Sequence, residues 1–210
     1  MFILDQLVAI YILGGPVVAV LISVSVVTFA VVLYKVWQFR RARVGQHIAI
    51  REALAKWDRD ECNAAERTLR TSRSYLAPIV TNALLCVDRK NMSARMEAEA
   101  ETQFNKLERG FRYLGTVAHL APLIGLLGTV LGIIEAFQAL PDTASSADPS
   151  LSADGIWISL LATAFGLVVA MATSMVLSWF EAKITNDRAF AELALTTIQA
   201  PVGKQLTHAS

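Results

Sequence analysis

Three long runs of uncharged, mostly apolar residues constrain this chain more than any other feature. Residues 6–34 contain no Asp, Glu, Lys, Arg or His, residues 113–134 contain no Asp, Glu, Lys or Arg, and residues 155–180 are uncharged. A helix needs about 20 apolar residues to cross the hydrocarbon core of a bilayer, so each run is long enough to span a membrane. Charged residues make up only 18% of the chain, against about 25% in soluble domains. The sequence therefore predicts an all-α integral membrane protein with three transmembrane helices.

Several function classes are disfavoured by composition and by motif. The net charge of +1 offers no basic field for a nucleic acid. The two cysteines, Cys62 and Cys86, do not form a CxxC pair and have no zinc-site spacing. The sequence has no nucleophile-elbow, zinc-protease or nucleotide-binding motif. We therefore predict no enzymatic activity, no cofactor and no metal site.

The basic residues predict the orientation. Of the 19 Lys and Arg residues, 16 lie between Lys35 and Arg112, three follow the third run, and none lies before the first run or between the second and third. Because cytoplasmic segments carry the excess of basic residues, the N-terminus is expected outside and the C-terminus inside. Arg40, Arg41 and Arg43 follow the first run, where we expect them to contact the head groups of membrane lipids.

These patterns divide the chain into six predicted segments. Residues 97–109 lack Gly and Pro, which favours one long helix running into the second span, and Pro78 is expected to kink or start a helix. Asp154 is expected to cap the third span. The predicted segments are a peripheral, lipid-facing transmembrane helix (1–39), a cytoplasmic helical region (40–111), a second transmembrane helix (112–140), a periplasmic loop (141–154), a third transmembrane helix (155–180) and a cytoplasmic helical tail (181–210).

Small residues recur at four-residue spacing in the second and third spans, where they allow helix backbones to approach closely. In the second span the rows contain Gly125, Gly128 and Gly132. In the third they contain Ala162, Gly166 and Ala170. The first span lacks such rows. The second and third spans are therefore predicted to form a tight interior, completed by copies of the chain in a ring because three helices cannot enclose a pathway alone.

Hydroxyls are the main polar groups predicted inside these spans. Thr129 and Thr163 both lie roughly 9–12 Å inside the outer boundary and can meet at one depth, and Ser159 lies one turn from Thr163. Alternatively, each threonine bonds a carbonyl of its own helix. Glu135 falls on the glycine face of the second span, and the alternative is that it sits solvated at the water boundary. His119 can relay protons or serve only as a helix-contact donor.

The second and third spans resemble the MotA/TolQ/ExbB proton-channel superfamily, and most closely ExbB and TolQ. The resemblance is carried by Leu120–Phe137, which contains APLIGLLGTV, and by Gly155–Ala170, which contains LLATAFGL. It implies a homopentamer in the bacterial inner membrane whose inner spans surround the single-span helices of an ExbD- or TolR-like partner, expected as a dimer. It also implies a third protein of TonB or TolA type, which ion flow would power.

The resemblance implies roles for particular residues. Thr129 and Thr163 match the family's two pore threonines, whose hydroxyls would hydrogen-bond a partner aspartate that takes up and releases protons. One position departs from the ExbB and TolQ pattern, because Ile158 stands where a glutamate usually follows the Gly-Ile that opens the third span. Glu135 is a candidate electrostatic replacement. The alternative function is a scaffold that assembles a partner helix and conducts nothing, and the sequence does not choose between H⁺ and Na⁺.

Overall fold

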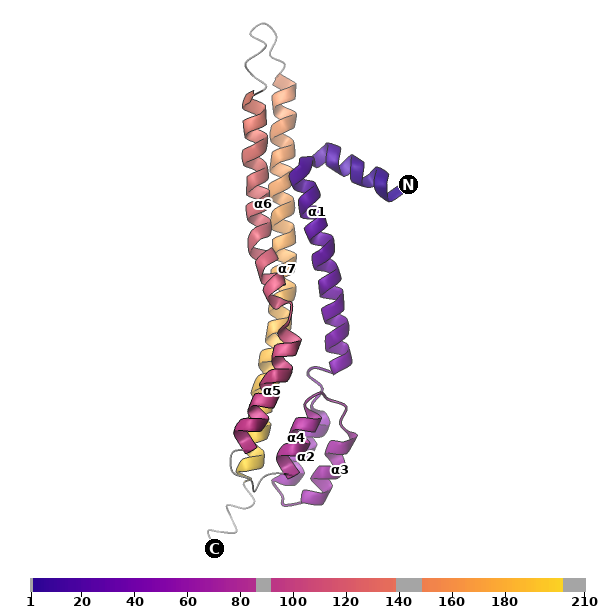
Figure 1. The fold of residues 1–210 in the computed structure, drawn as a ribbon, viewed down its shortest axis with the longest axis vertical. Coiled ribbons are helices and arrows are strands. Elements are labelled where there is room, and N and C mark those ends of the chain that lie inside the picture. The colour runs from indigo at the N-terminus through magenta and orange to yellow at the C-terminus, as the bar shows by residue number, and fades with distance from the viewer. Residues whose placement is uncertain (1, 86–91, 139–148, 202–210) are drawn as a thin grey trace. The chain divides into compact units, whose positions relative to one another are not determined.

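The computed structural model describes residues 2–85, 92–138 and 149–201, and within these ranges it contains helices and no strand (Figure 1). Side chains are described for residues 16–85, 94–138 and 156–201. The helices are α1 (Phe2–Ala42), α2 (Ile48–Trp57), α3 (Cys62–Thr71), α4 (Ala77–Leu85), α5 (Met92–Glu108), α6 (Phe111–Gln138) and α7 (Pro149–Gln199). The all-helical prediction is confirmed for this part of the chain.

Three of these helices contain a stretch long and apolar enough to cross a membrane. The stretches are Pro16–Ala42 in α1, Phe111–Gln138 in α6 and Ile156–Gln199 in α7. Their mean hydropathies over 18 residues are 2.7, 2.1 and 2.2. The protein is therefore a multi-pass membrane protein, and the three runs found in the sequence each lie within one helix.

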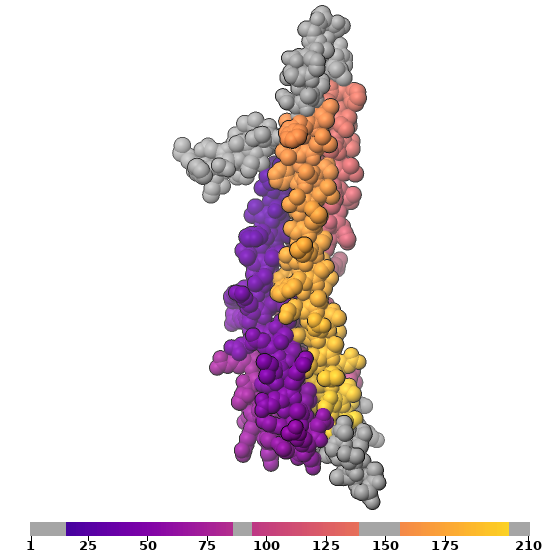
Figure 2. All heavy atoms as spheres, turned by 180° about the vertical axis from the view of Figure 1, so that it is seen from behind, coloured from indigo at the N-terminus to yellow at the C-terminus, as the bar shows by residue number. Residues whose placement is uncertain are grey.

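The chain divides into two compact units, and α1 and α7 contribute to both. The first unit comprises Met1–Leu33 and Gly110–Ser178, and thus holds the first part of α1, all of α6 and the first part of α7. A small buried cluster in this unit joins Leu21 of α1 with Val117 and Ala121 of α6 and Ala170 of α7. Figure 2 shows the side chains of α1 lying along those of α7 in the part of this unit whose residues are coloured.

The second unit comprises Tyr34–Arg109 and Trp179–Ser210, and it is built from α2 to α5 together with the ends of α1 and α7. Its described core draws side chains from α2, α3, α4, α5 and α7. Those on α2 and α7 are spaced three and four residues apart, which is how an amphipathic helix buries one face. The buried members include Ile50, Leu54 and Trp57 of α2, Leu69 of α3, Val80 of α4, Phe104 of α5, and Phe180, Ile184, Ala194 and Ile198 of α7. The Trp57 indole Nε1 also donates to the carbonyl oxygen of Ile198 at 3.3 Å, which ties α2 to α7.

Two boundary expectations were wrong and one was confirmed. The expected continuous helix into the second span is interrupted, because α5 ends at Glu108 and α6 begins at Phe111. Gly110 between them has φ of +96°, a left-handed conformation that glycine adopts readily and that ends helices. Asp154 does not cap the third span, since α7 already begins at Pro149, and proline is well suited to a first turn. Pro78 lies in the first turn of α4, as expected. Cys86 and most of the expected periplasmic loop, residues 141–148, lie outside the described residues.

Candidate functional site

The candidate site lies where α6 and α7 run antiparallel, and glycines bring the two backbones into contact there. A Cβ atom added at Gly166 would lie 2.5 Å from the carbonyl oxygen of Ala121, and one added at Gly125 would lie 2.9 Å from both the carbonyl oxygen of Ala162 and the Cα of Thr163. Both separations are shorter than any side chain tolerates, so neither position accepts a residue larger than glycine without a shift of the backbone. The small-residue rows predicted from the sequence therefore face one another within one chain.

Gly128 extends the contact to a third helix. A Cβ atom added there would lie 2.9 Å from the Cβ of Ala162 and 3.0 Å from the Cγ1 of Val17 on α1. Ala162 and Ala170 are buried, and Gly132 is half-buried. Part of α1 thus packs on the α6–α7 pair in a single chain, while Val20, Val26 and Phe29 remain exposed.

The hydroxyls of this region are each bonded to a carbonyl oxygen, but in two different ways. The Thr163 hydroxyl donates across the interface to the carbonyl oxygen of Gly125 at 2.9 Å. The Thr129 hydroxyl donates within its own helix to Leu126 at 2.6 Å, and the buried Ser159 hydroxyl donates within α7 to Ile156 at 2.7 Å. Thr129 therefore bonds a carbonyl oxygen of its own helix, whereas Thr163 has an interhelical partner.

The register of α6 and α7 refines the expected depth of the two threonines. Gly125 faces Thr163, and Thr129 lies four residues further along α6, which is about 6 Å. Because the helices are antiparallel, Thr129 is level with the region of Ser159, one turn away from Thr163. The three hydroxyls thus occupy two successive turns of the same helix pair.

The other residues that the sequence suggested lie outside this contact. Glu135 is exposed near the end of α6, and His119 is exposed on the same helix. Ile158 is half-buried on α7. Among the residues searched within the described ranges, no group of three or more His, Cys, Asp or Glu side chains is placed to hold a metal ion.

Sequence reasoning missed a buried polar cluster in the second unit, centred on Asp187 of α7. Asp187 Oδ1 lies 2.8 Å from His47 Nε2, and Oδ2 accepts from the Tyr75 hydroxyl at 2.8 Å and from the backbone N–H of Gly45 at 3.2 Å. The Ser74 hydroxyl lies 3.3 Å from His47 Nδ1. Asp187, His47 and Ser74 are all buried. An available signal was the position of Asp187 on the apolar stripe of the tail helix, three and four residues from other buried side chains.

The cluster holds Tyr75 in its neutral form. Burial is the largest cause, and the neighbouring Asp187 carboxylate adds to it, so the pKa of the Tyr75 hydroxyl is raised well above its ordinary value. The His47 ring also stacks on Phe190, with ring centroids 4.5 Å apart. Three segments that are distant in the sequence are therefore joined at one carboxylate.

Comparison with known proteins identifies a family to which this sequence is similar. The model of the MotA/TolQ/ExbB proton channel family matches residues 59–192. A putative biopolymer transport protein, ExbB-like 1, of Synechocystis is 33% identical over 165 residues, which cover 75% of this chain and 64% of that protein. A putative ExbB homolog of Methanothermobacter thermautotrophicus is 27% identical over 177 residues, covering 83% of this chain and 62% of the relative.

A TolQ protein is similar to this chain at a comparable level of identity. The Tol-Pal system protein TolQ of Haemophilus influenzae is 29% identical over 181 residues, which cover 76% of this chain and 75% of that protein. The chain thus spans just under two thirds of the length of the two ExbB-type relatives above and three quarters of TolQ. The family match covers more than half of the chain, including all of α6 and most of α7, so the chain belongs to the MotA/TolQ/ExbB proton channel family, within which it resembles the ExbB and TolQ members.

Proposed function

We propose that this chain is an ExbB/TolQ-like subunit of a motor in the bacterial inner membrane that is driven by the proton motive force. Helices α6 and α7 of five copies surround the membrane-spanning helices of an ExbD- or TolR-like partner, and ion flow past the partner powers an envelope task through a TonB- or TolA-like protein. Two features of the α6–α7 contact carry the proposal. The backbones of the two helices touch, and three hydroxyls, those of Thr129, Ser159 and Thr163, lie on two turns of this helix pair.

The chemistry of these hydroxyls fits a carboxyl group that gains and loses a proton. The hydrogens of Thr129 and Thr163 are already donated to carbonyl oxygens, so each hydroxyl oxygen offers lone pairs to a donor. A protonated partner carboxyl can donate to such an oxygen without any rearrangement. An ionised carboxylate has no proton to donate, so the hydroxyl must first turn away from its carbonyl. The two protonation states of the partner would therefore bind the site differently, which is what a proton-driven motion requires.

The exposed surface of α6 and α7 supports a ring of copies. Large apolar side chains that remain exposed in the single chain include Leu123, Leu126, Leu127 and Val130 of α6 and Phe165, Val168, Met171 and Met175 of α7. Some of this surface would face neighbouring copies or the partner, and the rest would face lipid. Because the described part of one chain offers three candidate spans, a pathway has to be assembled from several chains.

The proposed topology places the N-terminus outside, residues 40–111 and 181–210 in the cytoplasm, and residues 141–154 in the periplasm. A cysteine introduced at Ser146 should react with a membrane-impermeant thiol reagent in intact cells. Cys62, which is exposed on α3, should react only after the cells are lysed. Labelling of Cys62 from outside would reverse the orientation.

A second candidate function is a scaffold that assembles the partner and conducts no ions. The observation in its favour is that all three hydroxyls are already satisfied by carbonyl oxygens, which a purely structural role also explains. The replacement of the family glutamate by Ile158 points the same way, since it removes an acid from the inner spans.

Proton uptake into proteoliposomes separates the two functions. The native complex is purified from its membrane together with any partner that co-purifies. Its subunits are counted by particle imaging, and it is reconstituted with a pH-sensitive dye inside the vesicles. A motor subunit should give a ring with the partner inside and a proton current under an imposed potential. A ring that contains the partner but passes no protons above the lipid background would establish the scaffold instead.

A further inference from the structure

A cavity of about 330 Å³ lies beside the end of α1, and three cationic side chains line it. They are Arg40 and Arg43, from the end of α1 and the turn that follows it, and Lys183 of α7. Gln46 adds an amide, and the indole of Trp179 adds an apolar wall that is 52% exposed. No Asp or Glu is among the lining residues, so the cavity carries three positive charges and no carboxylate.

The turn after α1 brings these cations together. Arg43 and Gly45 both have left-handed backbone conformations, with φ of +53° and +82°. A Cβ atom at Gly45 would lie 3.3 Å from Lys183 Nζ, so the ammonium group of Lys183 lies directly against this turn. A glycine at position 45 thus permits both the backbone conformation and the approach of the lysine.

The three cations share the cavity without a neutralising carboxylate among its lining residues. None of them makes an ion pair with any residue that the structure describes. Asp187 lies one turn further along α7, but it is buried and its oxygens already bind His47, Tyr75 and the Gly45 N–H. Like charges around one small cavity repel one another, and an anion bound between them would remove that cost.

We propose that this cavity binds the phosphate group of an anionic phospholipid. Arginine and lysine are the side chains that recognise phosphate. The apolar part of the lining, from Val36, Phe39 and Trp179, suits a ligand that continues into an acyl chain. The cavity also lies next to the end of one candidate span, Pro16–Ala42, where interfacial tryptophans and basic residues meet lipid head groups. Such binding does not require ion conduction.

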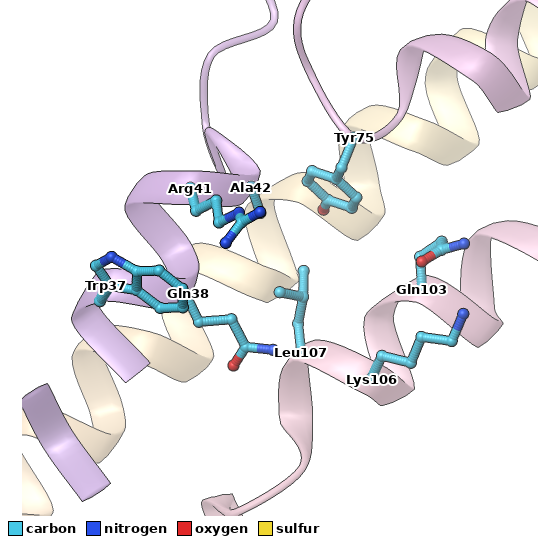
Figure 3. Close-up of a pocket in the computed structure, with 8 residues that line it drawn as sticks. All are labelled: Trp37, Gln38, Arg41, Ala42, Tyr75, Gln103, Lys106 and Leu107. Atoms are coloured by element: carbon cyan, nitrogen blue, oxygen red, sulfur yellow. The ribbon is translucent and has the colours of Figure 1, made fainter. Parts of the chain in front are cut away.

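A second cavity beside the same helix end provides a control (Figure 3). It has a volume of about 280 Å³, and Arg41 from α1 and Lys106 from α5 lie on opposite sides of it, with Leu107 between them. The guanidinium of Arg41 already lies over the Trp37 ring, 5.3 Å from its centroid. This cavity therefore has two cations, and one of them, Arg41, already contacts an aromatic ring. Removing both cations changes the net charge of the protein as much as removing two cations from the proposed site.

The test measures lipid binding to the purified full-length protein in detergent by native mass spectrometry. The protein is titrated with phosphatidylglycerol and, in parallel, with phosphatidylcholine, which has no net charge. Arg43→Gln/Lys183→Gln should weaken phosphatidylglycerol binding about 25-fold, at about fivefold for each cation that faces the bound phosphate. Arg41→Gln/Lys106→Gln should weaken it less than threefold, and Lys183→Arg should bind like the unaltered protein.

The remaining outcomes overturn the proposal. Equal losses in the two double variants would mean that diffuse surface charge, and no particular cavity, attracts the lipid. Displacement of phosphatidylglycerol by inorganic phosphate at equal concentration would mean that the ligand is a free phosphate. If Arg43→Gln/Lys183→Gln keeps its lipid but loses its oligomeric state, the cavity is a contact between subunits. Circular dichroism of each variant confirms the helical fold before titration.

Discussion

The helices within each of the two units of this chain are held together in different ways. In the unit of Met1–Leu33 and Gly110–Ser178, helices α6 and α7 pack closely because Gly125 and Gly166 have no side chain and let the two backbones touch. In the other unit, polar groups join α7 to the turn after α1 and to the segment before α4, with three donors converging on the buried Asp187. The first arrangement is damaged by adding atoms, whereas the second is damaged by removing them.

The largest effect is expected from enlarging Gly166. The Cβ of a valine at this position would lie 2.5 Å from the Ala121 carbonyl oxygen, so α6 and α7 must move apart. Overpacking of this kind costs roughly 3 kcal/mol or more, because backbone atoms cannot rotate away. Gly166→Val should abolish the native oligomer in size-exclusion chromatography and lower the melting temperature of the purified protein.

Ser174→Val is the matched control for that change. Ser174 lies two turns further along α7 and is exposed, so a larger side chain meets no backbone there. Its melting temperature should match that of the unaltered protein. Equal damage at Gly166 and Ser174 would contradict the close approach of α6 and α7.

Removing the carboxylate at Asp187 should have the next largest effect. Asp187→Ala leaves the His47 ring, the Tyr75 hydroxyl and the Gly45 N–H without their shared acceptor. Each buried donor left without a partner costs about 1–3 kcal/mol, so a total of about 3 kcal/mol or more is expected. Chemical unfolding followed by tryptophan fluorescence measures it, with Trp57 of the same unit as a reporter. A loss below about 1 kcal/mol would show that the cluster does not stabilise the unit.

Alkaline pH tests the same cluster more gently. Because the pKa of Tyr75 is raised in the folded protein, its neutral form contributes stability that is complete below about pH 10 and lost as the pH rises further. Tyr75→Phe should cost roughly 1.5–3 kcal/mol at pH 8, the contribution of a hydrogen bond to a charged acceptor. The difference between the two proteins should narrow above pH 10, and a constant difference up to pH 12 would contradict the assignment.

The smallest effect is expected at Arg188. Its guanidinium bonds Glu101 at 2.8 Å and Glu108 at 3.0 Å, yet its side chain is 41% exposed and those of the glutamates are 47% and 34% exposed. Exposed ion pairs contribute about 0–1 kcal/mol and are screened by salt. Arg188→Gln should therefore cost less than 1 kcal/mol, and the loss should vanish in 1 M NaCl. A larger loss would place these ion pairs among the main supports of the unit.

The sequence predicted the helices and the packing rows because these depend on local pattern. Uncharged runs marked the three spans, and four-residue spacing marked Gly125 and Gly166 as points of close approach. The sequence did not reveal the break at Gly110, since a single glycine marks a helix end only when its backbone turns left-handed. It also did not reveal the partner of Thr163, because the bond to Gly125, 38 positions earlier in the chain, depends on the register of two helices.

The buried cluster shows a further limit of local pattern. Asp187 stands out within an apolar stripe, but its partners His47 and Tyr75 come from distant segments whose approach depends on the whole unit. The cationic cavity arises in the same way, because Lys183 meets Arg43 only through the turn at Gly45. Such sites depend on tertiary contacts that one sequence does not encode in any short window.

Proton uptake by proteoliposomes of the complex tests most directly whether the hydroxyls of α6 and α7 act on a proton carried by the partner. Thr129→Val removes a hydroxyl that is bonded only within its own helix, so the ring should still assemble. The proton current should fall at least tenfold, because a hydrogen bond to the partner of about 1.5–3 kcal/mol is lost. Thr163→Ser keeps the interhelical donor and should conduct well, whereas Thr163→Val should lose both packing and current. A full current from an intact ring carrying Thr129→Val, in vesicles where the unaltered complex conducts, would contradict the claim.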